Sequence, residues 1–267
     1  MSDPTSSTST PTDLATKVKR RLSETGYPLE LRVAREARRH TNPVYVTQSR
    51  QYVDPLTDKL RETDVVACWT AQSGDDFRFV YLSIECKSKP LPWVIFDAGE
   101  GPTDDAKSRW EWAVRHEFPD PWSNAADLSD YFHLNRTLFR PSLVGTGVVE
   151  VDMGSSTPRD QRNAAWDAVQ SAVAAAHGIT RDMNPEDPLP GTEWASIRIA
   201  VFPVVVTSGA LFRGFLTPEG ELAVEPIERG EVLVRSSTDV GLTRCLIVTE
   251  DALPEVLAHA AETVKAL

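Results

Sequence analysis

Two strand-like runs separated by a tight turn constrain this chain more than any other feature of its sequence. The runs lie within residues 61–95, are rich in β-branched and aromatic side chains, and flank Gln-Ser-Gly-Asp-Asp at 72–76. This pattern is typical of a β-hairpin with its turn at about 73–76. In an antiparallel hairpin the residue numbers of paired positions have a constant sum, and Asp64 and Glu85 have the same sum as Gly74 and Asp75. The hairpin therefore predicts Asp64 opposite or nearly opposite Glu85.

Lys87 lies two residues beyond Glu85, so its side chain is expected on the same face of the sheet. Two adjacent carboxylates repel each other unless a cation joins them. Lys87 can supply one positive charge, and a divalent metal would supply the rest. Carboxylate oxygens of this kind suit Mg²⁺ or Mn²⁺. A one-residue bulge in either strand would shift the register and weaken this geometry.

Residues 26–34, Gly-Tyr-Pro-Leu-Glu-Leu-Arg-Val-Ala, have the pattern of a helix start with Glu30 in the first turn. This helix followed by the hairpin resembles the PD-(D/E)xK nucleases, the restriction-endonuclease-like superfamily. Their core is a helix bearing Glu and then a hairpin bearing Asp and Glu-x-Lys. The matching positions here are Glu30, Asp64 and Glu85-Cys86-Lys87. The resemblance covers roughly residues 13–96, with looser similarity in the order of later elements, and it departs at Thr63, where the superfamily motif has Pro.

The resemblance implies a metal-dependent nuclease that hydrolyses phosphodiester bonds, with DNA as the expected substrate. Asp64 and Glu85 would hold Mg²⁺ or Mn²⁺, with the Cys86 carbonyl as a further ligand. Lys87 would orient or help to deprotonate the attacking water and stabilise the developing phosphate charge. Glu30 would hold a second metal or a water ligand.

The net charge of −11 argues against a generic nucleic-acid binder, but the charge is unevenly distributed. Residues 1–51 contain nine Lys or Arg and five Asp or Glu, which leaves this section at +4 and the remainder at −15. The basic section adjoins the candidate site, so Arg32, Arg35 and Arg39 are expected to contact phosphates of a nucleic acid. A solvated basic helix face is the alternative interpretation.

The chain as a whole predicts an α/β fold: a restriction-endonuclease-like central mixed sheet flanked by helices, with additional C-terminal strands and helices. Residues 1–12 are expected to form a disordered tail and 13–267 a single domain with an insertion at about 97–146. Helices are expected over 12–26, from 28 onward, over about 106–116 and 125–128, over 157–177 and over 250–267. Strands are expected over 43–53, 93–96, 143–151, 197–207, 211–216, 222–227, 232–235 and 245–248, and a loop over 179–194.

Composition bears on the cellular compartment, on zinc binding and on membrane insertion. Three cysteines without paired spacing indicate a reducing cytoplasm rather than a disulfide framework. The five histidines lack the short spacing of a zinc site. No apolar run approaches the ~20 residues that span a membrane, and the N-terminus lacks a signal pattern. A homodimer or a protein partner stays open.

Two other interpretations compete with an active nuclease. The first is a catalytically inactive nuclease-like module that serves as a nucleic-acid-binding or protein-interaction subunit. The second is purely structural: Glu85 and Lys87 form a surface ion pair worth ~0–1 kcal/mol. In this interpretation Glu30 lies in the first turn of its helix because the helix dipole stabilises a carboxylate there. The structural interpretation leaves the juxtaposition of Asp64 and Glu85 unexplained. Glu36 is a weaker substitute for Glu30.

Overall fold

The computed structural model describes most of the chain, and its strands join in one mixed sheet. The described residues are 11–39, 43–74, 76–97, 114–118, 136–140, 142–154, 163–183, 196–235 and 242–267. The strands are β1 (Tyr45–Val53), β2 (Leu60–Ser73), β3 (Asp76–Lys87), β4 (Trp93–Asp97), β5 (Val114–Phe118), β6 (Val144–Glu150), β7 (Ser196–Thr207), β8 (Leu211–Leu216), β9 (Leu222–Ile227), β10 (Arg229–Arg235) and β11 (Leu242–Thr249). The helices are α1 (Pro11–Ser23), α2 (Tyr27–Arg39), α5 (Ala164–Asp182), the 3₁₀ helix η2 (Glu250–Ala252) and α6 (Leu253–Ala266).

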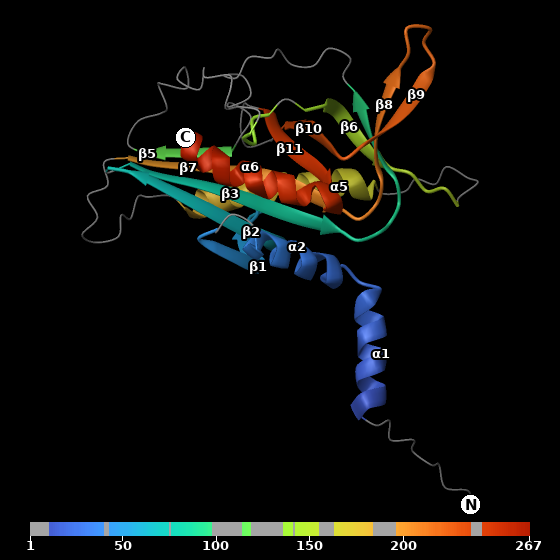
Figure 1. The fold of residues 1–267 in the computed structure, drawn as a ribbon, viewed down its shortest axis with the longest axis horizontal. Coiled ribbons are helices and arrows are strands. Elements are labelled where there is room, and N and C mark those ends of the chain that lie inside the picture. The colour runs from blue at the N-terminus through green and yellow to red at the C-terminus, as the bar shows by residue number, and fades with distance from the viewer. Residues whose placement is uncertain are drawn as a thin grey trace, which may run out of the picture.

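The described strands form an eleven-stranded sheet in the order β1-β2-β3-β7-β11-β10-β6-β4-β8-β9, with β5 pairing to β7 outside this path. The strands β3, β7 and β11 are parallel neighbours, and the β1–β2 and β2–β3 pairs are antiparallel. Helices flank the sheet on both sides (Figure 1). The predicted α/β class with a central mixed sheet is therefore confirmed.

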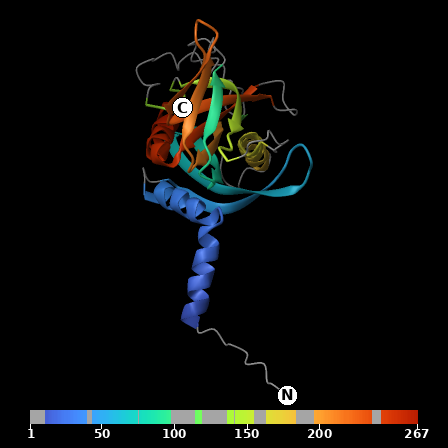
Figure 2. The same ribbon diagram turned by 90° about the vertical axis from the view of Figure 1, so that its right-hand side faces the viewer.

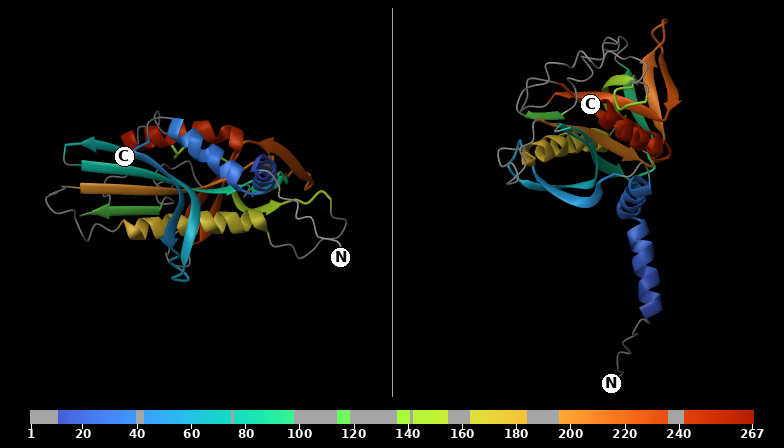
Figure 3. Two further views of the ribbon diagram at one scale, coloured as in Figure 1. Left: turned by 90° about the horizontal axis from the view of Figure 1, so that it is seen from below. Right: turned by 60° about the vertical axis from the view of Figure 1, so that its left-hand side comes forward.

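Two helical layers enclose the central strands. Figure 3 shows α2 and α6 on one side of the sheet and α5 on the other, with β1 and β2 curving around toward α5. Alternation along β3 divides its side chains between the layers. Leu82 and Ile84 pack in the core with α2 and α6, whereas Tyr81 packs with α5.

The helix α5 lies close against β1 because its sheet-facing side is made of small residues. Five alanines are buried there: Ala165, Ala168, Ala172, Ala175 and Ala176. The helix continues through Gly178, where a Cβ would lie 2.5 Å from Tyr52 Cδ2 and 2.8 Å from the Val53 carbonyl oxygen. The expectation that Gly178 ends this helix is wrong, since the glycine serves close packing instead. Asn163 caps the helix through its side chain, and the expected start of the helix at 157 lies outside the described residues.

The strand β7 is the buried strand that its apolar sequence predicts. The partners of β7 on its two edges explain how Pro203 is accommodated. The sequence predicts a bulge or an edge there, because proline lacks the N–H that a ladder needs. The structure keeps the β3–β7 register unbroken through Pro203. On its other side β7 pairs with β5 over 197–201 and with β11 from Val204 onward. Pro203 therefore lies in the gap between two pairing partners.

The N-terminal helix α1 projects away from the body of the molecule (Figures 1 and 2). Its stripe of Leu14, Val18 and Leu22 is exposed, and the helix has no buried residue. It ends at Ser23 rather than near Gly26. In α2, Leu29 and Val33 are buried as the periodicity predicts.

Other expectations shift in their boundaries. Residues 114–118 form β5, so the expected helix at about 106–116 is wrong in its last three residues, while its earlier part and the expected helix at 125–128 lie outside the described residues. The strands β10 and β11 begin three residues earlier than expected. None of the described helices is long and apolar enough to cross a membrane.

Candidate active site

The pairing of β2 with β3 keeps one register from the turn to Val65–Ile84. Gly74 has a φ of 60° in the turn, a left-handed conformation that glycine adopts without steric cost. Ser73 pairs with Asp76, which gives the sum of residue numbers that the sequence predicts. The positions that follow Val65 and Ile84 toward the open end are Asp64 and Glu85, so the predicted register is confirmed.

Beyond the Val65–Ile84 pair, side chains of β2 form hydrogen bonds with backbone groups of β3. The backbone N–H of Cys86 donates to Asp64 Oδ2 over 2.6 Å. The Thr63 hydroxyl donates to the Ile84 carbonyl oxygen over 3.3 Å. The simple expectation of two carboxylates standing side by side on one face is therefore modified: Asp64 reaches across the opened ladder to the strand that carries Glu85. It does so because its carboxylate satisfies an N–H that would otherwise lose its partner.

The strand β1 is irregular at the position that faces Asp64. Gln48 pairs with Val65 and Arg50 pairs with Thr63, while Ser49 between them has a φ of 53°. A non-glycine residue in this region costs on the order of 1–3 kcal/mol, and such strain is concentrated at functional sites. No pattern in the sequence signals Ser49, so it was not among the expected site residues.

Glu85 and Lys87 are joined by an ion pair on the α5 face of β3. Lys87 Nζ donates to Glu85 Oε1 over 2.7 Å, and 12% of the Glu85 side chain and 33% of the Lys87 side chain are exposed. The residues that alternate with them, Ile84 and Cys86, lie in the core formed with α2 and α6. This arrangement differs from an exposed surface pair, because both charged groups are largely removed from water.

The carboxyl groups of Asp64 and Glu85 lie in surroundings that disfavour their charged forms. Burial is the largest influence and raises the pKa of each group. The nearby Asp64 raises the pKa of Glu85 further, while Lys87 opposes both shifts. Burial alone would lower the pKa of Lys87, but Glu85 and Asp64 raise it above its usual value. One ammonium therefore neutralises only part of the charge of two carboxylates, which leaves room for a further cation.

Glu30 extends the acidic cluster from the helix α2. Burial raises the pKa of Glu30, and the negative charges of Asp64, Glu62 and Glu85 raise it further, in that order. The absence of a side chain at Gly26 leaves space for this carboxylate, since a Cβ there would lie 3.1 Å from Glu30 Oε1. Glu62 was missed in the sequence, although its place two residues before Asp64 on β2 could have suggested it.

Arg32 is bound to the body of the protein. Its Nε and Nη2 donate to the two carboxylate oxygens of Glu250 over 2.5 and 2.9 Å, and the hydrogen bond to Glu250 raises the pKa of Arg32. The guanidinium of Arg32 thus joins α2 to the start of η2, and its expected contact with phosphate stays a prediction that this pairing does not favour. Arg35 and Arg39 remain exposed on α2.

The oxygen donors of the site are of the chemical type that a hard divalent cation binds. Across the described part of the chain, no group of three or more His, Cys, Asp or Glu side chains is arranged to hold a metal. The Cys86 N–H points toward Asp64, and the N–H and C=O of a strand residue point to the same side, so its carbonyl is directed there too. Two carboxylates and one carbonyl suit Mg²⁺, which commonly binds one or two carboxylates and fills its other positions with water and substrate phosphate.

Comparison with known protein families, with characterised proteins and with solved structures finds no match to this chain.

The raised pKa of Asp64 predicts how the stability of the protein depends on pH. A carboxyl group whose pKa is higher in the folded state than its ordinary value of 3.8 contributes stability below that value and loses it as pH rises through the folded-state pKa. Asp64→Asn keeps an acceptor for the Cys86 N–H, and it has no carboxyl group to ionise, so it does not lose stability in this way as pH rises. Its melting temperature should therefore exceed that of the wild type at pH 7 but not at pH 3.5, as measured by calorimetry.

Two comparisons complete this test. Mg²⁺ at pH 7 should raise the melting temperature of the wild type and leave that of Asp64→Asn unchanged, because a ligand stabilises only the state that binds it. The variant Glu221→Gln, in the exposed turn after β8, is the control and should follow the wild type throughout. Equal pH profiles for the wild type and Asp64→Asn would contradict the proposed environment of Asp64.

Proposed function

We propose that this protein is a metal-dependent nuclease that hydrolyses phosphodiester bonds, with DNA as its substrate. The observation that carries the proposal is the cluster of Asp64, Glu85 and Lys87 at the point where the β2–β3 ladder opens. Two buried carboxylates with raised pKa values and one ammonium are costly to maintain. Perturbed groups of this kind gather at functional sites more often than elsewhere.

The order of the elements supports a restriction-endonuclease-like fold. The helix α2 carries Glu30, β1 follows it, and the β2–β3 hairpin carries Asp64 and Glu85-Cys86-Lys87. This is the order that the PD-(D/E)xK core requires up to the end of its hairpin.

Mg²⁺ or Mn²⁺ would be held by Asp64, Glu85 and the Cys86 carbonyl. A bound divalent ion supplies charge stabilisation to the phosphoryl oxygens and lowers the pKa of bound water.

The protein side chains divide the remaining work. Lys87 is an ammonium in this structure because its pKa is raised, so it acts as a donor that orients the attacking water and stabilises the developing phosphate charge. This favours orientation over deprotonation among the two roles expected for Lys87. Glu30, whose pKa is raised by burial and by Asp64, Glu62 and Glu85, would hold a second metal or a water ligand and would accept a proton from that water. The water oxygen would then form a bond to phosphorus, the ester P–O bond would break, and the leaving oxygen would take up a proton from solvent water.

A catalytically inactive nucleic-acid-binding module is the second candidate, and one observation favours it. Glu85 Oε1 is engaged by Lys87 at 2.7 Å rather than left open for a metal. A nuclease-like module without catalytic activity would keep the Glu85–Lys87 ion pair as a structural feature. A cleavage assay distinguishes the two candidates.

Two substitutions in the hairpin should separate metal binding from chemistry. Asp64→Asn removes a charge that a hard cation needs, so it should weaken Mg²⁺ binding and abolish cleavage together. Lys87→Ala removes no metal ligand and frees Glu85, so metal should bind at least as tightly while cleavage falls by about 100-fold or more. Calorimetric titration of Mg²⁺ or Mn²⁺ and a plasmid-nicking assay measure the two effects.

Cleavage that survives Lys87→Ala, or that persists in excess chelator, would contradict this mechanism. Metal binding by a wild type that cleaves no DNA or RNA would instead support the inactive module.

The basic face of α2 predicts a difference between its arginines. Replacing the exposed Arg35 and Arg39 with Ala should weaken DNA binding and reduce the slope of log affinity against log salt by about one for each phosphate that is no longer neutralised. The single variant Arg32→Ala is the control. Arg32 is bound to Glu250, so this variant should leave the slope unchanged. An unchanged slope in the double variant, measured by fluorescence anisotropy, would place the binding surface elsewhere.

A further inference from the structure

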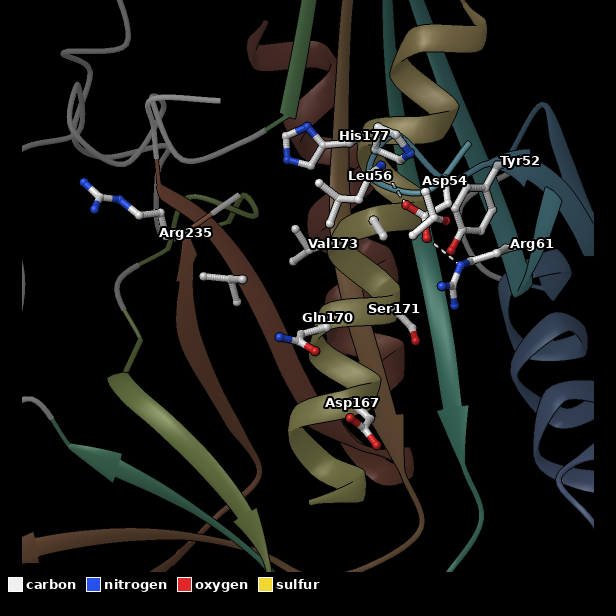
Figure 4. A pocket seen from close by; sticks show the side chains of 14 residues that line it. Tyr52, Asp54, Leu56, Arg61, Asp167, Gln170, Ser171, Val173, His177 and Arg235 are labelled. Carbon is white, nitrogen blue, oxygen red and sulfur yellow. Dashed lines mark hydrogen bonds and ion pairs between the residues drawn. The ribbon is translucent and has the colours of Figure 1, made fainter. Parts of the chain in front are cut away.

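A cavity of about 430 Å³ lies along the exposed side of α5, on the same side of the sheet as Glu85 and Lys87. Figure 4 shows its construction: Gln170, Ser171 and Val173 project from α5, with Tyr52 and Arg61 on one side and Arg235 on the other. The connection between β1 and β2 closes the cavity near Asp54 and Leu56. Its volume falls within the range of about 300–1,000 Å³ that is usual for sites of small ligands.

The charges of the lining balance, so the cavity suits an uncharged group. Asp54 is 3% exposed and accepts from Arg61 Nε at 2.5 Å and from the Leu56 N–H at 2.9 Å, so its charge is satisfied within the wall. The other ionised groups of the lining are Asp167 and Arg235, one of each sign. A phosphate or a carboxylate would find no excess of positive charge here.

The distribution of polar and apolar groups fits a flat heteroaromatic ring. The ring of Tyr52 and the side chains of Leu56, Val173 and Val234 supply apolar surface, and Gln170 and Ser171 supply hydrogen-bonding groups along one wall. Pockets that hold a displaced nucleobase combine these two properties: apolar or aromatic contact with the faces of the base and hydrogen bonds to its edge.

The cavity is close to the candidate active site along the β1–β2 ladder. Tyr52 lines the cavity and pairs with Arg61, which lies three residues before Asp64 on β2, or about 10 Å along an extended strand. Burial raises the pKa of Tyr52 to about 12, and among the contributing charges are Asp54 and Glu85. Tyr52 therefore lines the cavity and also lies within the electrostatic influence of Glu85.

We propose that this cavity holds one unstacked base of the substrate strand, next to the phosphodiester that lies at Asp64, Glu85 and Lys87. The protein would thus act on nucleic acid that is single-stranded beside the bond it cleaves, because a paired base has to leave its stack before it can enter. This inference rests on the proposed nuclease function and adds the class of substrate to it.

Abasic scanning of a single-stranded oligonucleotide tests the proposal with the full-length protein and Mn²⁺. An abasic site at one fixed distance from the cut should slow wild-type cleavage by about 10-fold, the effect expected from removing one stacked base. Ser171→Phe fills the cavity, so it should slow cleavage of the intact oligonucleotide by a similar factor and make cleavage insensitive to the abasic site. Thr70→Phe, which introduces the same side chain at an exposed position on β2 away from the cavity, is the control and should behave as the wild type.

A second measurement does not depend on cleavage. Deoxynucleoside and ribonucleoside 5′-monophosphates are titrated by NMR in excess chelator, and Ser171→Phe should abolish their binding while Thr70→Phe keeps it. A wild type that cleaves with a flat abasic profile, unaffected by Ser171→Phe, would overturn the cavity proposal and leave the nuclease proposal intact. Mononucleotide binding by a wild type that cleaves nothing would support the cavity and overturn the nuclease proposal, and loss of both would overturn both.

Discussion

The hydrogen bond from the Cys86 N–H to the Asp64 carboxylate is the interaction on which the candidate site depends. It replaces a rung of the β2–β3 ladder, so a charged side chain is drawn between two strands of a largely buried sheet. Glu85 and Lys87 flank Cys86 on β3, so they lie next to this hydrogen bond. The charges of Asp64, Glu85 and Lys87 contribute to the pKa shifts within this cluster. The kink at Ser49 in β1 lies opposite this rung, so the backbone irregularity and the charged cluster belong to one local structure.

The rest of the fold holds this opened ladder in place. On one side, β3 pairs with β7 without interruption from Asp76–Ser196 to Lys87–Thr207, so the strand that carries Glu85 and Lys87 stays paired within the sheet where its pairing with β2 ends. On the other side, the ion pair of Arg32 with Glu250 joins α2 to the segment after β11 and so fixes the helix that carries Glu30. The charge asymmetry of the chain has a structural counterpart, since the basic N-terminal section forms α1 and the exposed face of α2.

Local sequence patterns predicted much of the architecture, and long-range packing accounts for what they missed. The turn at Gly74 set the register of the hairpin, and the apolar run from Ile197 set β7, because these features are encoded by neighbouring residues. The continuation of α5 through Gly178 depends on contact with Tyr52, and the binding of Arg32 depends on Glu250, at the far end of the chain. The turn of Asp64 into the ladder could not be predicted from alternation alone, because it depends on where the β2–β3 pairing ends and leaves the Cys86 N–H without a backbone partner. Of the candidate site, the sequence identified Glu30, Asp64, Glu85 and Lys87, but not the contributions of Ser49 and Glu62.

Anomalous X-ray diffraction from crystals of the protein grown with Mn²⁺ tests the central claim most directly, because it locates the metal without reference to activity. The account predicts a single strong anomalous peak about 2 Å from a carboxylate oxygen of Asp64, a carboxylate oxygen of Glu85 and the Cys86 carbonyl oxygen, with Lys87 released from Glu85. A peak at any other place, or no peak at saturating Mn²⁺ with Glu85 still paired to Lys87, would contradict it.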